Sequence, residues 1–274
     1  MSSHPERQID AQEAASRPRP APELLVRPYT QPPPATLTGR FLRGLVNALE
    51  IGVARASRLP DSGVYETHDF PWASALEAGW SGVRSELDQV MVQRDRMPSF
   101  HEIISEVSTI TTDDRWKTFF LIGAGMDCSG NAARCPDTMK LLKEVPGIVT
   151  AFFSILAPGK HIPAHRGAYN GVLRLHLGLL VPEPREQCRI RIGERICTWQ
   201  EGKALIFDDT FNHEVWNDTD GWRVVLFIDF ARPLRQPWHW LNQLLIGLGP
   251  LAPFLREAGR KQKRWEKMFY STKK

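Results

Sequence analysis

The sequence predicts a mainly β protein: an antiparallel sandwich or jelly roll with flanking helices. From Val149 onward, short β-rich runs follow one another, and Gly, Pro, Asn and Asp separate them. No long helical pattern intervenes, which favours antiparallel over parallel pairing. Several runs are apolar at nearly every position, as in inner strands of a two-sheet sandwich. The runs cover residues 149–156, 172–181, 188–193, 196–199, 203–207, 213–217 and 222–230.

The N-terminal third has a different composition. Residues 1–38 contain eight prolines and few large apolar residues, so we predict a disordered leader. Residues 39–69 follow as an amphipathic helix and a linker. Apolar side chains recur there at four-residue steps (Phe41, Leu45, Leu49 and Val53). This helix either docks on the body of the protein or lies on a membrane.

The compact domain is predicted to span residues 70–233. Its first part has apolar residues at three- and four-residue steps over 73–94, which predicts a helix. A second helix is predicted around Thr138–Lys143, directly after Cys135-Pro136.

The C-terminal segment, residues 234–274, is basic and amphipathic. The chain carries a net charge of +4, yet residues 235–274 hold nine Lys or Arg and two Glu, a net +7. Tryptophans and leucines lie beside these charges, a mixture typical of interfacial segments. We therefore expect peripheral membrane contact. The alternative is a helix packed on the domain with a solvated basic end. No aromatic stacking platform accompanies the charge, which argues against a nucleic-acid partner.

The sequence favours a cytoplasmic location, extended by peripheral contact with the inner face of the membrane. The first twenty residues lack the apolar stretch of a secretory signal. No apolar run reaches the roughly 18 residues that a membrane-spanning helix requires. The four cysteines form no CxxC pair, so we expect neither a zinc knuckle nor a disulfide scaffold.

Two histidines in the β region are candidate metal ligands. His165 is expected on a loop between strands, and His213 follows 48 residues later at the start of a predicted strand. Two imidazoles from different parts of one barrel can converge on a metal such as Fe, Zn, Cu or Ni. The alternative is that each is an ordinary surface or hydrogen-bonded histidine. We assign His161 to a loop, because Pro163 excludes a helical pair with His165.

Three further polar residues lie within apolar strands. Arg223 is expected to be buried, and a buried charge needs a partner. Arg174 and His176 are two residues apart and so share one face of a strand. Such inward-facing donors suggest a carboxylate ligand, which arginine holds through two hydrogen bonds. The alternative is an internal salt bridge, for example from Arg223 to Asp229 or Asp209.

The same region resembles the aspartyl/asparaginyl β-hydroxylase family. The blocks FSILAPGKHIPAHRGAYNGVLRLHLGLLVP, CRIRIG, TWQEGKALIFDDTFNHEVWNDTD and WRVVLFIDFARP carry this resemblance, which runs from about Phe70 to Pro233. It implies a double-stranded β-helix, also called a cupin-like jelly roll. It also implies an oxygenase that uses Fe(II), with 2-oxoglutarate and O2 as cosubstrates.

The resemblance also assigns roles to residues. His165 and His213 match the iron ligands, and Arg223 matches the arginine that holds the distal carboxylate of 2-oxoglutarate. Four residues match further cosubstrate positions: Ser154, Arg174, His176 and Trp116.

One position departs from the pattern of the wider oxygenase group. The usual facial triad is HxD…H, but here Gly167 stands in place of the aspartate. The gap leaves a coordination position for water or, in a halogenase, for halide. Asp208 and Asp209 precede His213 by five and four residues and could supply a carboxylate ligand. We assign them instead to a turn, or to a position that contacts a ligand residue and not the metal.

The predicted activity is hydroxylation of an unactivated C–H bond. The C-terminal segment favours a lipid acyl chain or another membrane-associated substrate. The first alternative is peptidyl aspartyl/asparaginyl β-hydroxylation; a free or carrier-bound amino acid is another. The non-enzymatic alternative is a cupin-like protein that binds a ligand without turning it over.

Overall fold

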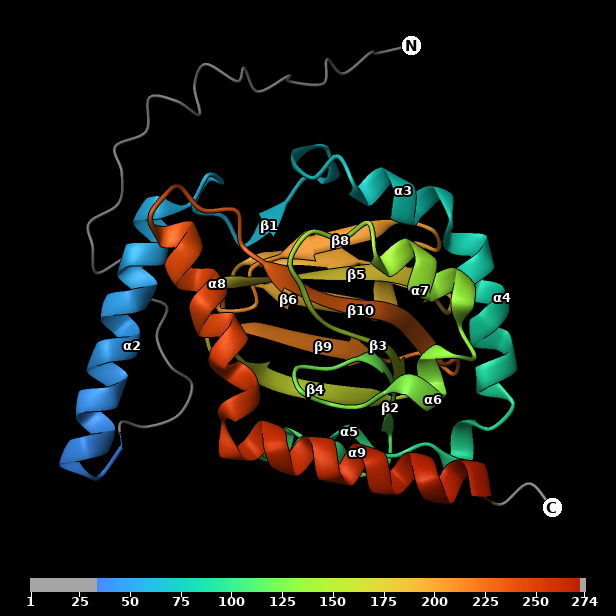
Figure 1. Ribbon diagram of the computed structural model, residues 1–274. Helices are drawn as coiled ribbons and strands as arrows, with labels where there is room; N and C mark the ends of the chain where they lie inside the picture. Colours follow the sequence, from blue (N-terminus) through green and yellow to red (C-terminus); the bar gives the residue numbers. More distant parts are fainter. Residues whose placement is uncertain (1–33, 272–274) are drawn as a thin grey trace, which may run out of the picture.

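A computed structural model describes residues 34–271 and shows two antiparallel β-sheets stacked face to face, with helices around them (Figure 1). The large sheet has the strand order β1-β8-β5-β10-β3-β2, and the small sheet has the order β4-β9-β6-β7. The strands are β1 (Val64–Tyr65), β2 (Trp116–Ile122), β3 (Ile148–Leu156), β4 (Lys160–His165), β5 (Val172–Leu180), β6 (Cys188–Ile192), β7 (Arg195–Thr198), β8 (Ala204–Phe207), β9 (His213–Asn217) and β10 (Arg223–Ala231).

The order in which the chain visits the sheets defines the topology. From β3 to β10 it alternates between the large and the small sheet, with only the β6–β7 hairpin staying in one of them. Strands from the two halves of this path interleave, so that β10 lies between β3 and β5, and β9 between β4 and β6. This winding is a double-stranded β-helix, and it confirms the predicted jelly-roll fold with flanking helices.

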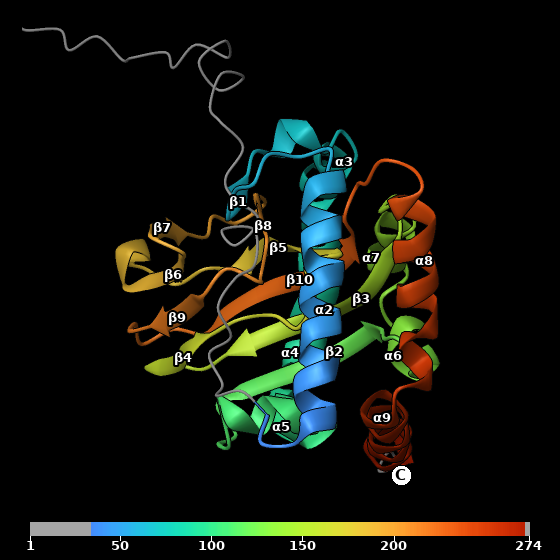
Figure 2. The same ribbon diagram turned by 90° about the vertical axis from the view of Figure 1, so that its left-hand side faces the viewer.

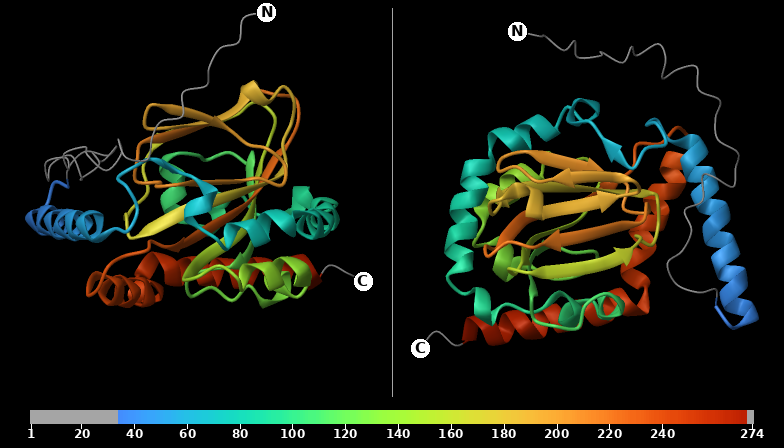
Figure 3. Two further views of the ribbon diagram at one scale, coloured as in Figure 1. Left: turned by 90° about the horizontal axis from the view of Figure 1, so that it is seen from above. Right: turned by 180° about the vertical axis from the view of Figure 1, so that it is seen from behind.

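Two apolar layers result from strand alternation. Residues such as Phe152, Val225 and Phe227 point between the sheets, where they pack with Trp199 and Ile190 of the small sheet side. Their neighbours along the strands point to the outer face of the large sheet. Helices α3 (Ala73–Ala78), α4 (Trp80–Met91) and α7 (Pro136–Leu142) cover that outer face (Figure 3). The polar residues discussed below lie in the inner layer.

Three longer helices frame one side and the base of the barrel. They are α2 (Leu37–Ala56), α8 (Trp238–Leu248) and α9 (Pro253–Ser271). Helix α2 begins two residues before the predicted start at 39, because the Thr36 side chain accepts a hydrogen bond from the Gly39 amide. The rest of the predicted leader, residues 1–33, lies outside the described residues. Figure 2 shows α2 and α8 along the same side of the molecule.

The remaining helical segments are short and connect these elements. They are α5 (Phe100–Ile103), α6 (Ser129–Ala132) and the 3-10 turns η2 (Thr67–Asp69), η3 (Arg94–Arg96), η4 (Ser105–Thr109), η5 (Arg185–Gln187) and η6 (Gly249–Leu251).

Two sequence predictions need correction. The helix predicted over 73–94 is divided at Gly79, where the backbone packs closely against Leu141 of α7 and a side chain would collide with it. His161, which was assigned to a loop, lies in β4 opposite Trp216, and its Nε2 contacts the Glu214 carboxylate at 2.7 Å. Pro163 excludes a helix there but does not prevent a strand at the edge of the small sheet.

Candidate active site

The two predicted metal ligands meet between neighbouring strands. His165 is the last residue of β4, His213 is the first residue of β9, and the two are direct partners in the antiparallel pair. Their ring centroids are 4.1 Å apart. Residues 48 positions apart in sequence are therefore brought together by the small sheet alone.

Backbone carbonyls fix the orientation of both rings. Nδ1 of His165 lies 2.8 Å from the Pro163 carbonyl oxygen, and Nδ1 of His213 lies 2.9 Å from the Phe211 carbonyl oxygen. A carbonyl only accepts, so each Nδ1 carries the proton and each Nε2 keeps a lone pair for a metal. Burial lowers the pKa of His165 to about 4, and burial together with His165 lowers the pKa of His213. Both rings are thus neutral near pH 7, the form that binds metals.

Within residues 34–271, no group of three or more His, Cys, Asp or Glu is arranged to hold a metal ion. The protein would therefore supply two imidazoles and leave the remaining positions to small ligands. Gly167 explains why a third ligand is missing: a side chain at this position would collide with the carboxylate of Asp209. That carboxylate therefore lies against the backbone of Gly167, two residues after the candidate ligand His165.

Asp209 is in turn held by Arg174. Nη2 of Arg174 lies 2.8 Å from Asp209, and Nε lies 2.9 Å from Asp229, its cross-strand neighbour on β10. Burial raises the pKa of Asp209 to about 7, although Arg174 acts in the opposite direction. Burial alone would lower the pKa of Arg174, but the two carboxylates raise it on balance. The guanidinium carbon also lies 4.1 Å from the ring centroid of Phe227, so an aromatic ring covers one of its faces.

Arg223 is in a different situation. Its side chain is 2% exposed, yet Nε and Nη1 have no hydrogen-bond partner among the described residues. Its guanidinium carbon lies 4.6 Å from the ring of Trp199, and burial lowers its pKa to about 10. The alternative considered from the sequence, a salt bridge from Arg223 to Asp229 or Asp209, does not occur among the described residues. Both carboxylates pair with Arg174 instead. A buried cation with unused donors implies a site for an anionic ligand.

His176 adds a second donor to the same inner layer. Its Nδ1 accepts a hydrogen bond from Nε1 of Trp199 at 3.3 Å, because an indole nitrogen can only donate. Burial, followed by the nearby Arg223, lowers the pKa of His176 well below its usual value. The neutral ring must then carry its proton on Nε2, which has no partner within residues 34–271. Arg223 and His176 therefore both present unused N–H groups.

Strands β3 and β2, beside β10 in the same sheet, add hydroxyl groups to this inner layer. Nε1 of Trp116 donates to Oγ of Ser154 at 2.9 Å, across neighbouring strands β2 and β3. Thr118 is the direct partner of Ser154, is fully buried, and has a hydroxyl with no described partner. Trp116 and Ser154 were predicted at cosubstrate positions. Thr118 and Trp199 were not, because nothing in their local sequence marks their distant partners.

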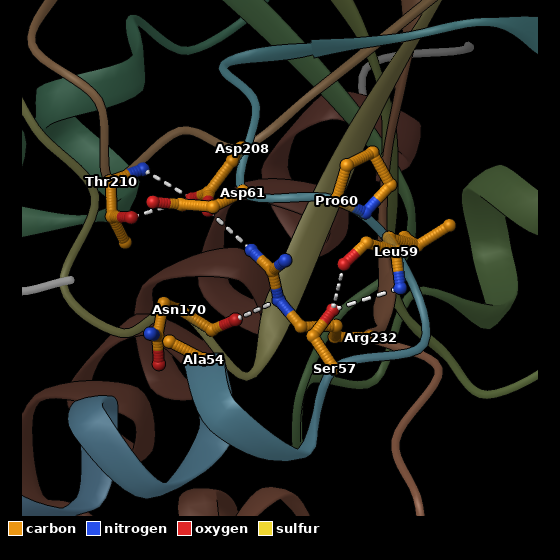
Figure 4. A pocket seen from close by; sticks show the side chains of 9 residues that line it. All are labelled: Ala54, Ser57, Leu59, Pro60, Asp61, Asn170, Asp208, Thr210 and Arg232. Carbon is orange, nitrogen blue, oxygen red and sulfur yellow. Dashed lines mark hydrogen bonds and ion pairs between the residues drawn. The ribbon is translucent and has the colours of Figure 1, made fainter. Parts of the chain in front are cut away.

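A buried ion pair holds the loops behind the histidines (Figure 4). Arg232 pairs with Asp208 and also donates to the Asn170 carbonyl oxygen and to the Tyr65 hydroxyl. Asp208 accepts from the amide and hydroxyl of Thr210 at 3.0 and 2.6 Å. The predicted turn role of Asp208 fits this geometry: it shapes the turn that leads to His213.

A second buried pair holds the loop that follows His165. Arg166 lies 2.6 Å from Glu50 of α2, and the two side chains are 3% and 1% exposed. The backbone carbonyl of Glu50 also accepts from the Asn170 side chain. Helix α2, although it precedes the barrel by a linker, is therefore connected directly to the residue beside a candidate ligand.

Comparison with known proteins agrees with this architecture. The family model described as aspartyl/asparaginyl beta-hydroxylase matches residues 77–233, more than half of the chain. The chain belongs to the aspartyl/asparaginyl β-hydroxylase family. The predicted family is thereby confirmed, together with the assignment to hydroxylases, and residues His165, His213 and Arg223 all lie inside the matched region.

Members of this family differ in how much of the chain they share. The chain is 45% identical over 268 residues to the ornithine lipid ester-linked acyl 2-hydroxylase of Rhizobium tropici, covering 96% of this chain and 94% of that protein. It is 33% identical to human aspartyl/asparaginyl beta-hydroxylase over 168 residues, which cover 60% of this chain and only 21% of the human protein. A prolyl-4-hydroxylase structure from Pseudomonas putida covers 66% of this chain and 98% of that one, with 15% identity and a TM-score of 0.39.

Proposed function

We propose that this protein is an Fe(II)- and 2-oxoglutarate-dependent hydroxylase that acts on the acyl chain of a membrane lipid of the ornithine-lipid class. The dependence on Fe(II) and 2-oxoglutarate is supported by two neutral imidazoles together with unused N–H donors in the same inner layer of the barrel. A dicarboxylate with one end on a metal and the other on an arginine matches both features.

Each residue has a distinct part in this proposal. His165 and His213 would hold Fe(II) through Nε2, with ring orientation set by the Pro163 and Phe211 carbonyls. The Arg223 guanidinium would hold the distal carboxylate of 2-oxoglutarate, and Nε2–H of His176 would donate to the same ligand. When bound, iron with 2-oxoglutarate and O2 supplies the oxidising power that inserts oxygen into a C–H bond.

The protein's own contribution is positioning and the exclusion of water. Phe152, Val225 and Phe227 belong to the apolar inner layer that holds these donors, so the donors act in a medium of low polarity. Arg174 holds the Asp209 carboxylate against Gly167, in the segment that follows His165. This ion pair would help to fix the position of that segment.

The lipid substrate is supported by the extent of one similarity. The match to the ornithine-lipid acyl hydroxylase covers α2, α8 and α9 as well as the barrel, whereas the match to the human peptidyl enzyme covers 60% of this chain. Elements outside the barrel are therefore shared with the lipid-modifying protein. Peptidyl aspartyl/asparaginyl hydroxylation is the alternative that the family name supports.

The test combines cosubstrate turnover with product analysis. Purified protein loaded with Fe(II) is supplied with 2-oxoglutarate, O2 and ornithine lipid dispersed in detergent. We expect succinate and a lipid that has gained one oxygen atom in its acyl chain. His213→Ala is the control and should form neither product.

Other outcomes distinguish the alternatives. Oxygen gained by an Asp- or Asn-containing peptide, with an unmodified lipid, would move the assignment to the peptidyl enzyme. An absence of succinate formation with every substrate, from protein shown to contain Fe(II), would favour the cupin-like binding protein.

A further inference from the structure

Helix α8 buries a polar side chain and exposes several large apolar ones. Its buried residue is polar: Asn242 accepts from the Tyr169 hydroxyl and donates to the Gly171 carbonyl oxygen. Its apolar side chains recur at three- and four-residue steps on the outer side (Trp240, Leu241, Leu244 and Leu248). Trp240 is 69% exposed and Leu244 is 58% exposed. A surface helix normally turns its apolar side inward, so this outward stripe needs a covering partner.

Helix α2 continues the same apolar surface. Its buried residues all lie in the C-terminal third, and the remainder exposes Leu37, Phe41, Leu42 and Leu45. The two helices are in contact, since a side chain at Gly52 would collide with the ring of Trp238. Figures 1 and 2 both place them on one side of the molecule. Of the thirteen large apolar side chains exposed within residues 34–271, ten belong to α2, α8, the turn η6 and the first turn of α9.

The charge of this surface is of one sign. The chain carries no Asp or Glu from Leu37 to Leu49 or from Phe230 to Arg256. The same stretches contain exposed cations at Arg40, Arg235 and Arg256. Apolar side chains bordered by arginine alone match an anionic bilayer, in which acyl chains lie beneath negative headgroups.

Beyond its first turn, the basic helix α9 packs on the protein. In α9, Ala258, Gln262 and Phe269 are buried against the barrel, and Lys261 is engaged with Glu257 and Ser105. The membrane contact expected for residues 235–274 stays a prediction, and most of the exposed apolar side chains within 235–271 lie in α8 and the turn that follows it. No described helix is long and apolar enough to span a bilayer, so the contact would be peripheral.

We infer that α2 and α8 together form a docking face for an anionic lipid bilayer. The loop 166–171, which follows the candidate ligand His165, lies between them: Glu50 of α2 pairs with Arg166, and Asn242 of α8 binds Tyr169 and Gly171. Docking would therefore bring the candidate active site to the membrane surface. This inference extends the proposed function by naming the surface from which a lipid substrate reaches the site.

The experiment is co-sedimentation with vesicles of phosphatidylcholine, with and without phosphatidylglycerol. Two double variants test the face, Phe41→Glu/Leu45→Glu on α2 and Trp240→Glu/Leu244→Glu on α8. All four side chains are exposed, so the variants should fold as the wild type does. Val92→Glu, at an 84% exposed site after α4 on another side of the molecule, is the matched control.

We expect the wild type and Val92→Glu to pellet with the anionic vesicles. Each double variant should bind these vesicles at least roughly tenfold more weakly than the wild type, a loss of about 1.4 kcal/mol of binding free energy. Binding should weaken as salt rises, because the arginine contribution is screened. Succinate formation with detergent-dispersed lipid should be unchanged in the double variants, so loss of docking is distinguishable from loss of the proposed activity.

Three results would overturn the inference. The wild type could fail to pellet at low salt, or the double variants could pellet like the wild type. The third is a wild-type dimer in sedimentation velocity that the double variants convert to a monomer without changing vesicle binding, since a second copy would then cover the face.

Discussion

Two buried arginines of the inner layer, Arg174 and Arg223, differ in what surrounds them. Arg174 contacts two carboxylates, those of Asp209 and Asp229, at 2.8 and 2.9 Å. Within residues 34–271, Arg223 forms no salt bridge, and two of its three nitrogens have no hydrogen-bond partner. Its guanidinium carbon lies 4.6 Å from the ring centroid of Trp199.

The different surroundings indicate a different role for each arginine. A buried cation with its partners in place contributes to the folded structure, and removing it leaves unpaired carboxylates behind. A buried cation without partners lowers stability and is retained when a ligand completes it. We therefore expect Arg174 to stabilise the folded protein and position Asp209, and Arg223 to bind a ligand.

The largest expected effect concerns the imidazole pair of His165 and His213. His165→Ala and His213→Ala should each reduce 2-oxoglutarate turnover to the background of the assay, because one imidazole and small ligands would remain for the metal. Succinate formation and bound iron are the measurements. Retention of full activity in either variant would remove that histidine from the site.

Replacement of Arg174 should mainly reduce stability. Arg174→Met leaves Asp209 and Asp229 buried without a cation, and we expect the free energy of unfolding to fall by about 3–5 kcal/mol. Chemical denaturation of the metal-free protein measures this. A stability within error of the wild type would place Arg174 with the ligand-binding groups and remove the contrast.

Replacement of Arg223 should act in the opposite direction. Arg223→Met removes an unpaired buried charge, so we expect the metal-free protein to gain about 1–3 kcal/mol of stability. The same denaturation experiment applies. A loss similar to that of Arg174→Met would mean that Arg223 has a partner within the protein.

The smallest expected effect concerns the histidine tautomer. Trp199→Phe removes the N–H that donates to Nδ1 of His176, so Nε2–H is no longer enforced. We expect the KM for 2-oxoglutarate to rise by roughly fivefold, equivalent to about 1 kcal/mol for one hydrogen bond. Steady-state kinetics with a fixed lipid concentration would measure it, and an unchanged KM would exclude a role for this hydrogen bond.

Much of the barrel could be predicted from the sequence. Seven runs of apolar and β-branched residues correspond to seven strands within two residues at each end. Strand β4 was missed because Gly159 and Pro163 are turn residues by composition, and its pairing with β9 is not a local property. The division at Gly79 depends on contact with Leu141 of a distant helix.

The site could be predicted only in part. The residues His165, His213, Arg223, Arg174 and His176 were identified from motif and alternation. The sequence does not reveal which arginine pairs with Asp209 and Asp229, because this depends on the register of β5 against β10, which places Arg174 opposite Asp229. The links from Glu50 to Arg166 and from Trp199 to His176 join segments 116 and 23 residues apart, with no local signal.

The most direct test of the account is the affinity for 2-oxoglutarate itself, measured by calorimetry without O2 on protein loaded with Fe(II). The wild type should bind, and Arg223→Met should lose about 2–5 kcal/mol of binding free energy while retaining its iron. Arg174→Met, studied at a temperature where it stays folded, should retain most of the affinity. Equal affinity in the wild type and Arg223→Met would contradict the central claim that the unpartnered arginine is the anchor of the cosubstrate.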